Sequence, residues 1–559
     1  MVSSSSALPV VPPWGQRVKE KRQVCRDAIP EAWRLPQDFW EQVQTPLQTS
    51  RNNFIALAAV QKSGILSDRE VNITEHKTVA ALLGELASGQ ITATEAITAF
   101  SKRAAIAQQL TNCLTETYFP EAKNRAVELD NMREAGQLAG PLHGLPISLK
   151  DSFQIIGSEA TIGMVAFLGQ KSTTNSALVD LLINLGAVLY CKSNVPQTMM
   201  TADSDNNIFG RTLNPWNTSL CAGGSSGGEG ALISMRGAPI GVGTDIAASC
   251  CGTYGFKPTA CRIPYGNQRG CSNPGFRPIP ACAGPLANDI ESLGIFMKAV
   301  VSARPRQYDS TAIDVPWRKT SFSKAKLRFG VVAEDPRFPL HPPVKAALDS
   351  AARLIEAQGH EIIHLSPNEC RIDHAAQVAW SLFSLDDTSS RLVAHAGEPP
   401  IPSRLLLQQV VRKIGMEFVA DANSLSELQR LAALTVKKAE VVDSWNKLWN
   451  VHQLDAVISP SAQNSAVKHD EFNFPPYTMF LNLLDYPACV IPFGKDAGTS
   501  PEFKIEDGQI VPNYNPKDLE GSPLSIQVFT SSMRDEECLD IAKVVDDCLG
   551  GGNRDEPHF

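Results

Sequence analysis

Residues 223–251 contain two serines that could take part in nucleophilic catalysis. Ser225 lies in the run GGSSGGEG, and Ser249 follows 24 residues later in the run AASCC. Both stand among small residues, which let backbone N–H groups approach a bound molecule closely. A serine hydroxyl is a poor nucleophile until a base removes its proton, and the chain has no nucleophile elbow with a matching Asp and His. The two serines are therefore a candidate catalytic pair that still requires a base.

The run GGSSGGEG has two simpler interpretations. Glycine-rich loops that lead into helices bind phosphate through backbone N–H groups, but the Lys-Ser/Thr pair of a P-loop does not follow this loop. A tight turn that needs glycine for positive φ angles is the commoner explanation of such a run taken by itself. The choice between a turn and a catalytic loop therefore depends on other positions in the chain.

The elements around these serines are typical of an α/β protein. A helix and a strand separate Ser225 from Ser249, and the alternating run GLPISLKDSF predicts a strand that ends at Lys150. Residues 176–185 predict a helix, and residues 187–193 predict a strand. Further helices are predicted over 36–43, 92–106, 121–134, 344–358, 424–449 and 535–549, and further strands in KLRFGVV, HEIIHLS, DAVIS, ACVIPF and LSIQVF.

Two of the predicted helices begin with the spacing of a capping box. Thr92 precedes Glu95, and Ser424 precedes Glu427, by three residues each. Residues 196–285 carry much of the glycine, asparagine and proline, so we expect loops there. Loops on a rigid sheet are where functional sites usually lie.

The composition limits the class of protein. The chain has 559 residues, 43% of them hydrophobic, with a net charge of -8 and a pI near 5.8. This charge argues against binding to nucleic acid or to an anionic membrane and favours a small, neutral or apolar partner. We expect no signal peptide, no transmembrane segment and a cytoplasmic location. The 13 cysteines and 10 histidines show no zinc-ligand spacing, so we expect reduced thiols, no metal and no cofactor.

The domain organisation follows from the distribution of regular elements. We expect an irregular or helical N-terminal arm over residues 1–60, a single domain over 61–548 and a flexible C-terminal tail over 549–559. No repeat, low-complexity block or strong linker divides the central part. The sequence does not determine the oligomeric state, and a homodimer is compatible with it.

Five motifs resemble the amidase signature family in their order and spacing. They are GLPISLKDSF, NVPQTMM, DNNIFGRTLNPWN, GGSSGGEGALISMRGAPIGVGTDI and YGFKPT. The chain is similar above all to the fungal acetamidase-like members, less so to fatty-acid amide hydrolases, over about residues 60–548. The resemblance implies one α/β domain, in which a large mixed β-sheet is sandwiched between layers of helices.

Carried over to this chain, the family's Ser-Ser-Lys triad falls on Ser249, Ser225 and Lys150. The resemblance implies that Ser249 is the acyl nucleophile, that Ser225, held by a cis peptide bond, relays protons, and that neutral Lys150 is the base. It also implies that Met199 lines the substrate side. The oxyanion hole that it implies consists of the backbone N–H groups of Ile246, Ala247, Ala248 and Ser249. A lysine with an ordinary pKa near 10.4 is a useful base only when burial lowers that pKa, by up to about 3 to 5 units, so Lys150 must be buried.

The chain departs from the family around the nucleophile. The family pattern is Asp-Ile-Gly-Gly-Ser-Ile-Arg, whereas residues 245–251 read DIAASCC. Alanine keeps its N–H, but a left-handed φ there would cost roughly 1 to 2 kcal/mol. The missing arginine leaves Asp245 without its family partner. We expect Cys250 and Cys251 to be packing residues rather than nucleophiles, and the enzyme to be either specialised or weakened.

These observations predict a serine hydrolase that cleaves a non-peptide carboxylic amide through a Ser249 acyl-enzyme, with a small-molecule amide as its substrate. Three alternatives stay open: a repurposed acyltransferase or hydrolase in a biosynthetic pathway, a weakly active or inactive amidase-like protein, and the amidase subunit of a glutamine-dependent transamidation complex. The N-terminal arm argues against the last. Four apolar residues could line an acyl pocket, although ordinary packing is their commoner role: Met199, Met200, Phe209 and Trp216.

Overall fold

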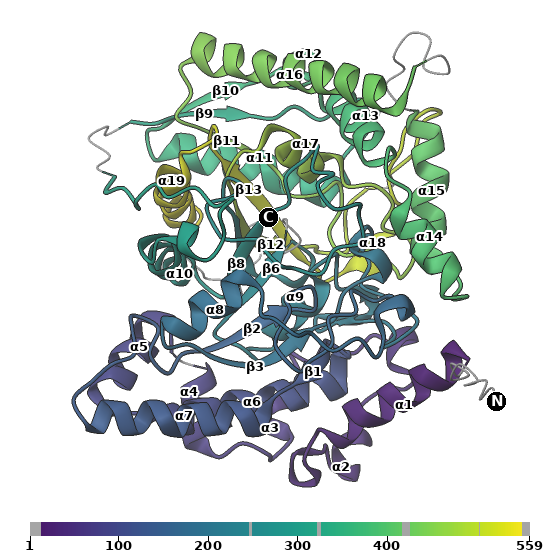
Figure 1. Cartoon of the computed structure of the whole chain (residues 1–559). Coiled ribbons are helices and arrows are strands. Elements are labelled where there is room, and N and C mark those ends of the chain that lie inside the picture. Colours follow the sequence, from purple (N-terminus) through teal and green to yellow (C-terminus); the bar gives the residue numbers. More distant parts are fainter. Residues whose placement is uncertain are drawn as a thin grey trace, which may run out of the picture.

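An eleven-stranded mixed β-sheet runs through the molecule and is surrounded by helices (Figure 1). The computed structural model describes residues 13–75, 77–244, 249–320, 326–415, 425–501 and 503–550. The strands follow the order β1-β3-β2-β6-β8-β7-β12-β13-β11-β9-β10, and β4 and β5 form a separate pair. The strands are β1 (Leu114–Thr117), β2 (Pro146–Lys150), β3 (Val188–Ser193), β4 (Leu213–Asn214), β5 (Asn217–Cys221), β6 (Ile240–Thr244), β7 (Tyr254–Lys257), β8 (Ala283–Ala287), β9 (Arg328–Val331), β10 (Glu361–His364), β11 (Ala456–Pro460), β12 (Ala488–Lys495) and β13 (Pro523–Phe529).

The α-helices cover the sheet along its whole length (Figure 1). They are α1 (Trp14–Asp27), α2 (Gln37–Trp40), α3 (Ala59–Lys62), α4 (Asp68–Glu75), α5 (Val79–Ser88), α6 (Ala93–Thr111), α7 (Phe119–Glu134), α8 (Ala177–Asn184), α9 (Gly227–Ser234), α10 (Ile290–Ser302), α11 (Pro342–Ala357), α12 (Pro367–Cys370), α13 (Ile372–Phe383), α14 (Thr388–His395), α15 (Pro402–Ile414), α16 (Glu427–His452), α17 (Pro476–Leu484), α18 (Pro516–Leu519) and α19 (Asp535–Cys548). In the described ranges, no helix combines the length and the apolar character needed to cross a bilayer.

Three neighbouring parallel strands, β3, β2 and β6, form the part of the sheet that carries Lys150. Every residue of β2 and β6 is buried, so neither strand shows the alternation of a half-exposed sheet. Parallel strands covered on both faces have this uniform burial. Lys150 lies at the end of β2, in register with Ser193 of β3.

Most of the predicted elements are confirmed. The strand that ends at Lys150, the following helix and strand, the strand-helix-strand unit of β9, α11 and β10, and the C-terminal helix all occur. The capping box of Thr92 and Glu95 is present, with both hydrogen bonds formed. The predicted short helix over 36–43 is reduced to α2.

The predicted capping box at the start of α16 was wrong. The helix begins at Glu427, its N-cap is Ser426, and the reciprocal hydrogen bonds join Ser426 to Gln429. Ser424 lies outside the described residues. Two overlapping serine patterns had the required spacing. Ser426, whose φ is -63° and ψ 160°, has the extended backbone that lets its hydroxyl accept from the N–H of Gln429.

The segment before residue 60 contributes to the main hydrophobic core. Phe39 and Phe54 are each 1% exposed and belong to the same buried cluster as the strands. Gln109 of α6 holds the segment, since its side chain accepts from the N–H of Leu35 and donates to the carbonyl of Trp33. Of the predicted C-terminal tail over 549–559, only residues 549 and 550 are described.

Candidate active site

Lys150 is fully buried and points its amine at two hydroxyl groups. Its Nζ lies 2.7 Å from Ser225 Oγ and 2.5 Å from Thr244 Oγ1. The side chain is 0% exposed, which confirms the prediction that it must be buried. Thr244 ends β6, the strand next to β2, so the sheet itself brings this hydroxyl to the lysine.

Ser225 lies just before α9, at the wall of a cavity. The peptide bond between Gly224 and Ser225 is cis, as the resemblance implied. A side chain at position 224 would clash with the backbone, because its Cβ would lie 2.4 Å from the carbonyl oxygen of Thr201 and 2.9 Å from the Cα of Ala202. Glycine at this position therefore lets two backbone segments meet beside the serine hydroxyl.

The neighbouring serine, Ser226, joins the start of α9 to the end of β6. Its hydroxyl donates to the carbonyl of Thr244 at 3.0 Å and accepts from the N–H of Thr244 at 3.2 Å. Ser226 is 0% exposed. This pair of bonds fixes Thr244 relative to Ser225, so the two hydroxyl groups described next to the Lys150 amine are held by one connection.

The segment that carries Ser249 is described only in part. Helix α9 and strand β6 separate it from Ser225, as the sequence indicated, and Ser249–Cys251 form a 3₁₀ turn. Asp245, the predicted oxyanion-hole residues Ile246, Ala247 and Ala248, and the side chain of Ser249 lie outside the described residues. The next residue, Cys250, lines the same cavity as Ser225.

The cavity has a largely apolar lining, and its described lining residues include no charged side chain. Of the four predicted pocket residues, Met199 and Met200 lie there. Phe209 and Trp216 are not among the described lining residues: Phe209 packs with Val18 and Val165 elsewhere, and the indole of Trp216 donates to Ser234 and to the Cys251 carbonyl. The remaining lining residues come from separate parts of the chain: Thr201, Ala202, Gly223, Gly224, Trp380, Phe383, Leu407, Ser461, Ala462, Phe472, Pro475, Thr478, Met479 and Asn482.

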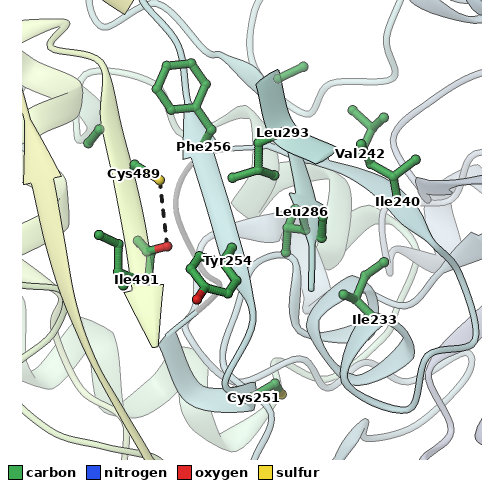
Figure 2. Close-up of a cluster of buried hydrophobic side chains, with 14 of the residues drawn as sticks. Ile233, Ile240, Val242, Cys251, Tyr254, Phe256, Leu286, Leu293, Cys489 and Ile491 are labelled. Carbon is green, nitrogen blue, oxygen red and sulfur yellow. Dashed lines mark hydrogen bonds between the residues drawn. The ribbon is translucent and has the colours of Figure 1, made fainter. Parts of the chain in front are cut away.

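Cys251 packs into the core. Figure 2 shows it on the turn below Tyr254, at the edge of a cluster of buried apolar side chains that includes Ile233 and Leu286. Its thiol donates to the carbonyl of Ala222 at 3.3 Å, and burial raises its pKa. A thiol with a raised pKa is a poor nucleophile at neutral pH.

A second buried lysine, Lys192, holds the chain just after the end of β2. Its amine lies 3.3 Å from Asp151 Oδ1, and both side chains are 0% exposed. Asp151 also accepts from the N–H groups of Thr161 and Ile162. This ion pair fixes the residue that follows Lys150, and sequence reasoning missed it because nothing in the spacing of the two residues indicates a contact.

A buried carboxyl group, that of Glu229 in the first turn of α9, also lies close to this site. It accepts hydrogen bonds from Ser148 and from Ser193, the latter at 2.5 Å. Burial raises the pKa of Glu229 to about 7, while the two serine bonds and the charge of Lys150 act in the opposite direction. In the sequence, the one feature that set Glu229 apart was its position as a single charged residue between glycines at the start of a predicted helix.

In the described ranges, no group of three or more His, Cys, Asp or Glu side chains could hold a metal ion. The described atoms place a buried amine in contact with a hydroxyl group, and that hydroxyl lies at the wall of a cavity. Such an arrangement can move a proton between a substrate and the amine.

Comparisons with known proteins identify the family. The family model described as "Amidase" matches residues 95–539. An amidase from Gibberella moniliformis is 36% identical over 548 residues, covering 96% of this chain and 99% of the relative. An acetamidase from Emericella nidulans is 34% identical over 565 residues, covering 96% of this chain and 98% of the relative.

The fold agrees with this assignment. A solved structure of a fatty acid amide hydrolase superposes with a TM-score of 0.87 and 29% sequence identity, covering 96% of this chain and 95% of the other. The large mixed sheet with its surrounding helices is confirmed as the amidase-signature fold. The chain therefore belongs to the amidase family, whose members are enzymes that hydrolyse amide bonds.

Proposed function

We propose that the protein hydrolyses a linear carboxylic amide of a small molecule through an acyl-enzyme on Ser249, with Ser225 as the proton relay and Lys150 as the base. Hydrolysis of amide bonds is the chemistry of the family. The observation that carries the finer proposal is the contact of 2.7 Å between the buried Lys150 amine and the Ser225 hydroxyl at the cavity wall.

The first half of the reaction forms the ester. Ser249 Oγ attacks the amide carbonyl carbon while its proton passes to Ser225, and the Ser225 proton passes to Lys150 Nζ. The ammonium then returns a proton through Ser225 to the amide nitrogen, so the C–N bond breaks with release of a neutral amine. This return is required because an amide anion is a very poor leaving group.

The second half consumes one water. The relay takes a proton from water as its oxygen attacks the ester carbon, and the Ser249 oxygen leaves with a proton returned through Ser225. The products are a carboxylic acid and the free enzyme. Full burial supports this role for Lys150, because desolvation disfavours the charged form of an amine.

The cavity favours an apolar acyl group. Aromatic and aliphatic side chains such as Trp380, Phe383 and Leu407 form much of its wall. One relative is named for acetamide and one structural neighbour for fatty acid amides. We propose a substrate whose acyl group is apolar and larger than acetyl, since a two-carbon group would leave most of this wall without contact. The oxyanion role of the backbone at 246–249 stays a prediction.

A fluorophosphonate probe tests the nucleophile. The wild-type protein should be labelled at Ser249, as located by mass spectrometry of the modified peptide, and Ser249→Ala should not be labelled. A matched control is Ser219→Ala, which removes a serine outside the cavity wall and should leave labelling intact. Folded wild-type protein that takes up no label would count against the proposal.

Product analysis separates hydrolysis from acyl transfer. An amide library is incubated with the enzyme, with and without an added primary amine, and the products are measured by mass spectrometry. Hydrolysis predicts the carboxylic acid as the main product in both cases. A product joined to the added amine in preference to water would instead support the acyltransferase.

A further inference from the structure

The carboxyl group of Glu229 is hydrogen-bonded to β2, the strand that carries Lys150, and to the neighbouring strand β3. Its Oε1 accepts from Ser148, which precedes Lys150 by two residues in β2, and its Oε2 accepts from Ser193 in β3 at 2.5 Å. Residues two apart in a strand lie on the same face. Ser193 is the partner of Lys150 in the register of the two strands. The carboxyl therefore bonds to a same-face neighbour and to a cross-strand neighbour of the lysine.

The carboxyl group of Glu229 fits against β6 because the residue of β6 beside it is a glycine, which has no side chain. Gly241 pairs with Ser148, and a Cβ there would lie 1.8 Å from Glu229 Oε1 and 2.6 Å from Ser148 Oγ. Glu229 is 0% exposed. The carboxyl also lies in the first turn of α9, where the helix dipole favours a negative charge.

We propose that Glu229 is a positioning residue for Lys150. Its carboxylate fixes Ser148 and Ser193 beside the lysine and stabilises the ammonium that forms when the lysine takes the proton of Ser225. This inference rests on the proposed role of Lys150 as the base. Glu229 itself exchanges no proton with substrate; it accepts two hydrogen bonds throughout the cycle while the proton moves between Ser249, Ser225 and Lys150.

The surroundings of Glu229 make the ionisation of its carboxyl group sensitive to the charge of Lys150. Burial raises the pKa of Glu229 to about 7, and the charge of Lys150 opposes that rise. The other titratable groups described near it are Cys113, which lies between α6 and β1, and Tyr190 and Cys191 of β3. Burial raises the pKa of each, so all three are neutral at pH 7. A positive charge on Lys150 therefore acts on a carboxyl close to its own titration point.

The pH dependence of labelling by a fluorophosphonate tests the inference without a known substrate. Labelling needs neutral Lys150, so its rate rises along an acidic limb. Glu229→Gln keeps the volume and removes the negative charge, which makes the ammonium less stable. We expect the acidic limb to move to lower pH by about 0.5 to 1 unit, at the low end of the effect of a nearby opposite charge. The plateau rate should fall by up to about 3- to 10-fold, since the base becomes weaker by the same amount.

Asp535→Asn is the matched control. Asp535 is also a carboxyl group with 0% exposure that accepts from a backbone N–H and a hydroxyl, in this case both of Thr259. It lies at the start of α19, outside the lysine site. This variant should lose stability and keep the acidic limb of the wild type. Equal shifts in both variants would indicate a general loss of packing and overturn the inference.

Ser193→Ala covers the case in which Glu229→Gln does not fold. It removes one hydrogen bond to the carboxylate and keeps Glu229 itself. Because this hydrogen bond lowers the pKa of Glu229, its loss leaves less of the carboxyl group ionised, and the acidic limb should move in the same direction by a smaller amount. An acidic limb that stays in place in a folded variant, or moves to higher pH, overturns the role of Glu229. Absence of Ser249 labelling in the wild type would instead contradict the proposed function.

Discussion

Thr244 gives a quantitative test of how the lysine is used. Its hydroxyl lies 2.5 Å from Lys150 Nζ, and Thr244→Val replaces that hydroxyl with a methyl group of similar size. The backbone bonds between Thr244 and Ser226 do not involve the changed atom. The substitution therefore removes one polar partner of the amine and leaves the path from Ser225 in place.

The magnitude follows from the change in charge during the reaction. A hydrogen bond between neutral groups contributes about 0.5 to 1.5 kcal/mol, and one to a charged group about 1.5 to 3 kcal/mol. In the proposed mechanism Lys150 is neutral in the resting enzyme and loses the smaller amount, whereas the ammonium formed later loses the larger. The difference of about 1 to 1.5 kcal/mol predicts labelling of Ser249 that is slower by about 5- to 12-fold.

The assay is the second-order rate of fluorophosphonate labelling, with Thr111→Val as control. Thr111 is also 0% exposed, and its hydroxyl donates at 2.7 Å to the carbonyl of Ala107 within α6. We expect this control to label at a rate within about twofold of the wild type, as for a change outside the site. A Thr244→Val rate equal to that of the control would refute the reasoning.

Two further predictions concern substrate preference and pH. Trp380→Ala should enlarge the cavity and raise the ratio of labelling by a bulky over a small fluorophosphonate by about tenfold or more; an unchanged ratio would mean that the indole does not contact the acyl group. Burial lowers the pKa of His341 to about 4, so the unfolded state binds the extra proton first as the pH falls. Stability should therefore decline by roughly 3 kcal/mol between about pH 6.5 and 4. His341→Leu should show a smaller decline in melting temperature over that range, and an equal decline in both proteins would contradict this assignment.

The regular elements of the active-site half could be predicted because their signals are local. The buried strand before Lys150 and the helix and strand between Ser225 and Ser249 follow from short patterns of residue type. The roles of these residues came from the motifs, since the glycine-rich run alone favoured a simple turn over a catalytic loop. The residues that hold the lysine, such as Thr244 and Glu229, needed the register of neighbouring strands, which a single sequence does not contain.

The far wall of the cavity could not be predicted for a different reason. Trp380, Leu407 and Phe472 lie far from the motifs in sequence, and nothing in their local pattern distinguishes them from ordinary core residues. They reach the site because the chain returns through helices α13 and α15 and the loop after β11. Of the candidate pocket residues, Phe209 and Trp216 have the packing role that was the commoner alternative, because proximity in sequence to the motifs is not proximity to the cavity.

The division of the cavity wall between two stretches of sequence has an evolutionary consequence. The groups assigned to chemistry come from residues 150–251, whereas most of the aromatic and aliphatic wall comes from residues 380–482. Mutations in the second stretch can change which acyl group is accepted while the atoms that move protons stay in place. Substitutions in the second stretch alone could therefore give this enzyme a different substrate, without any change in the stretch that carries Lys150 and Ser225.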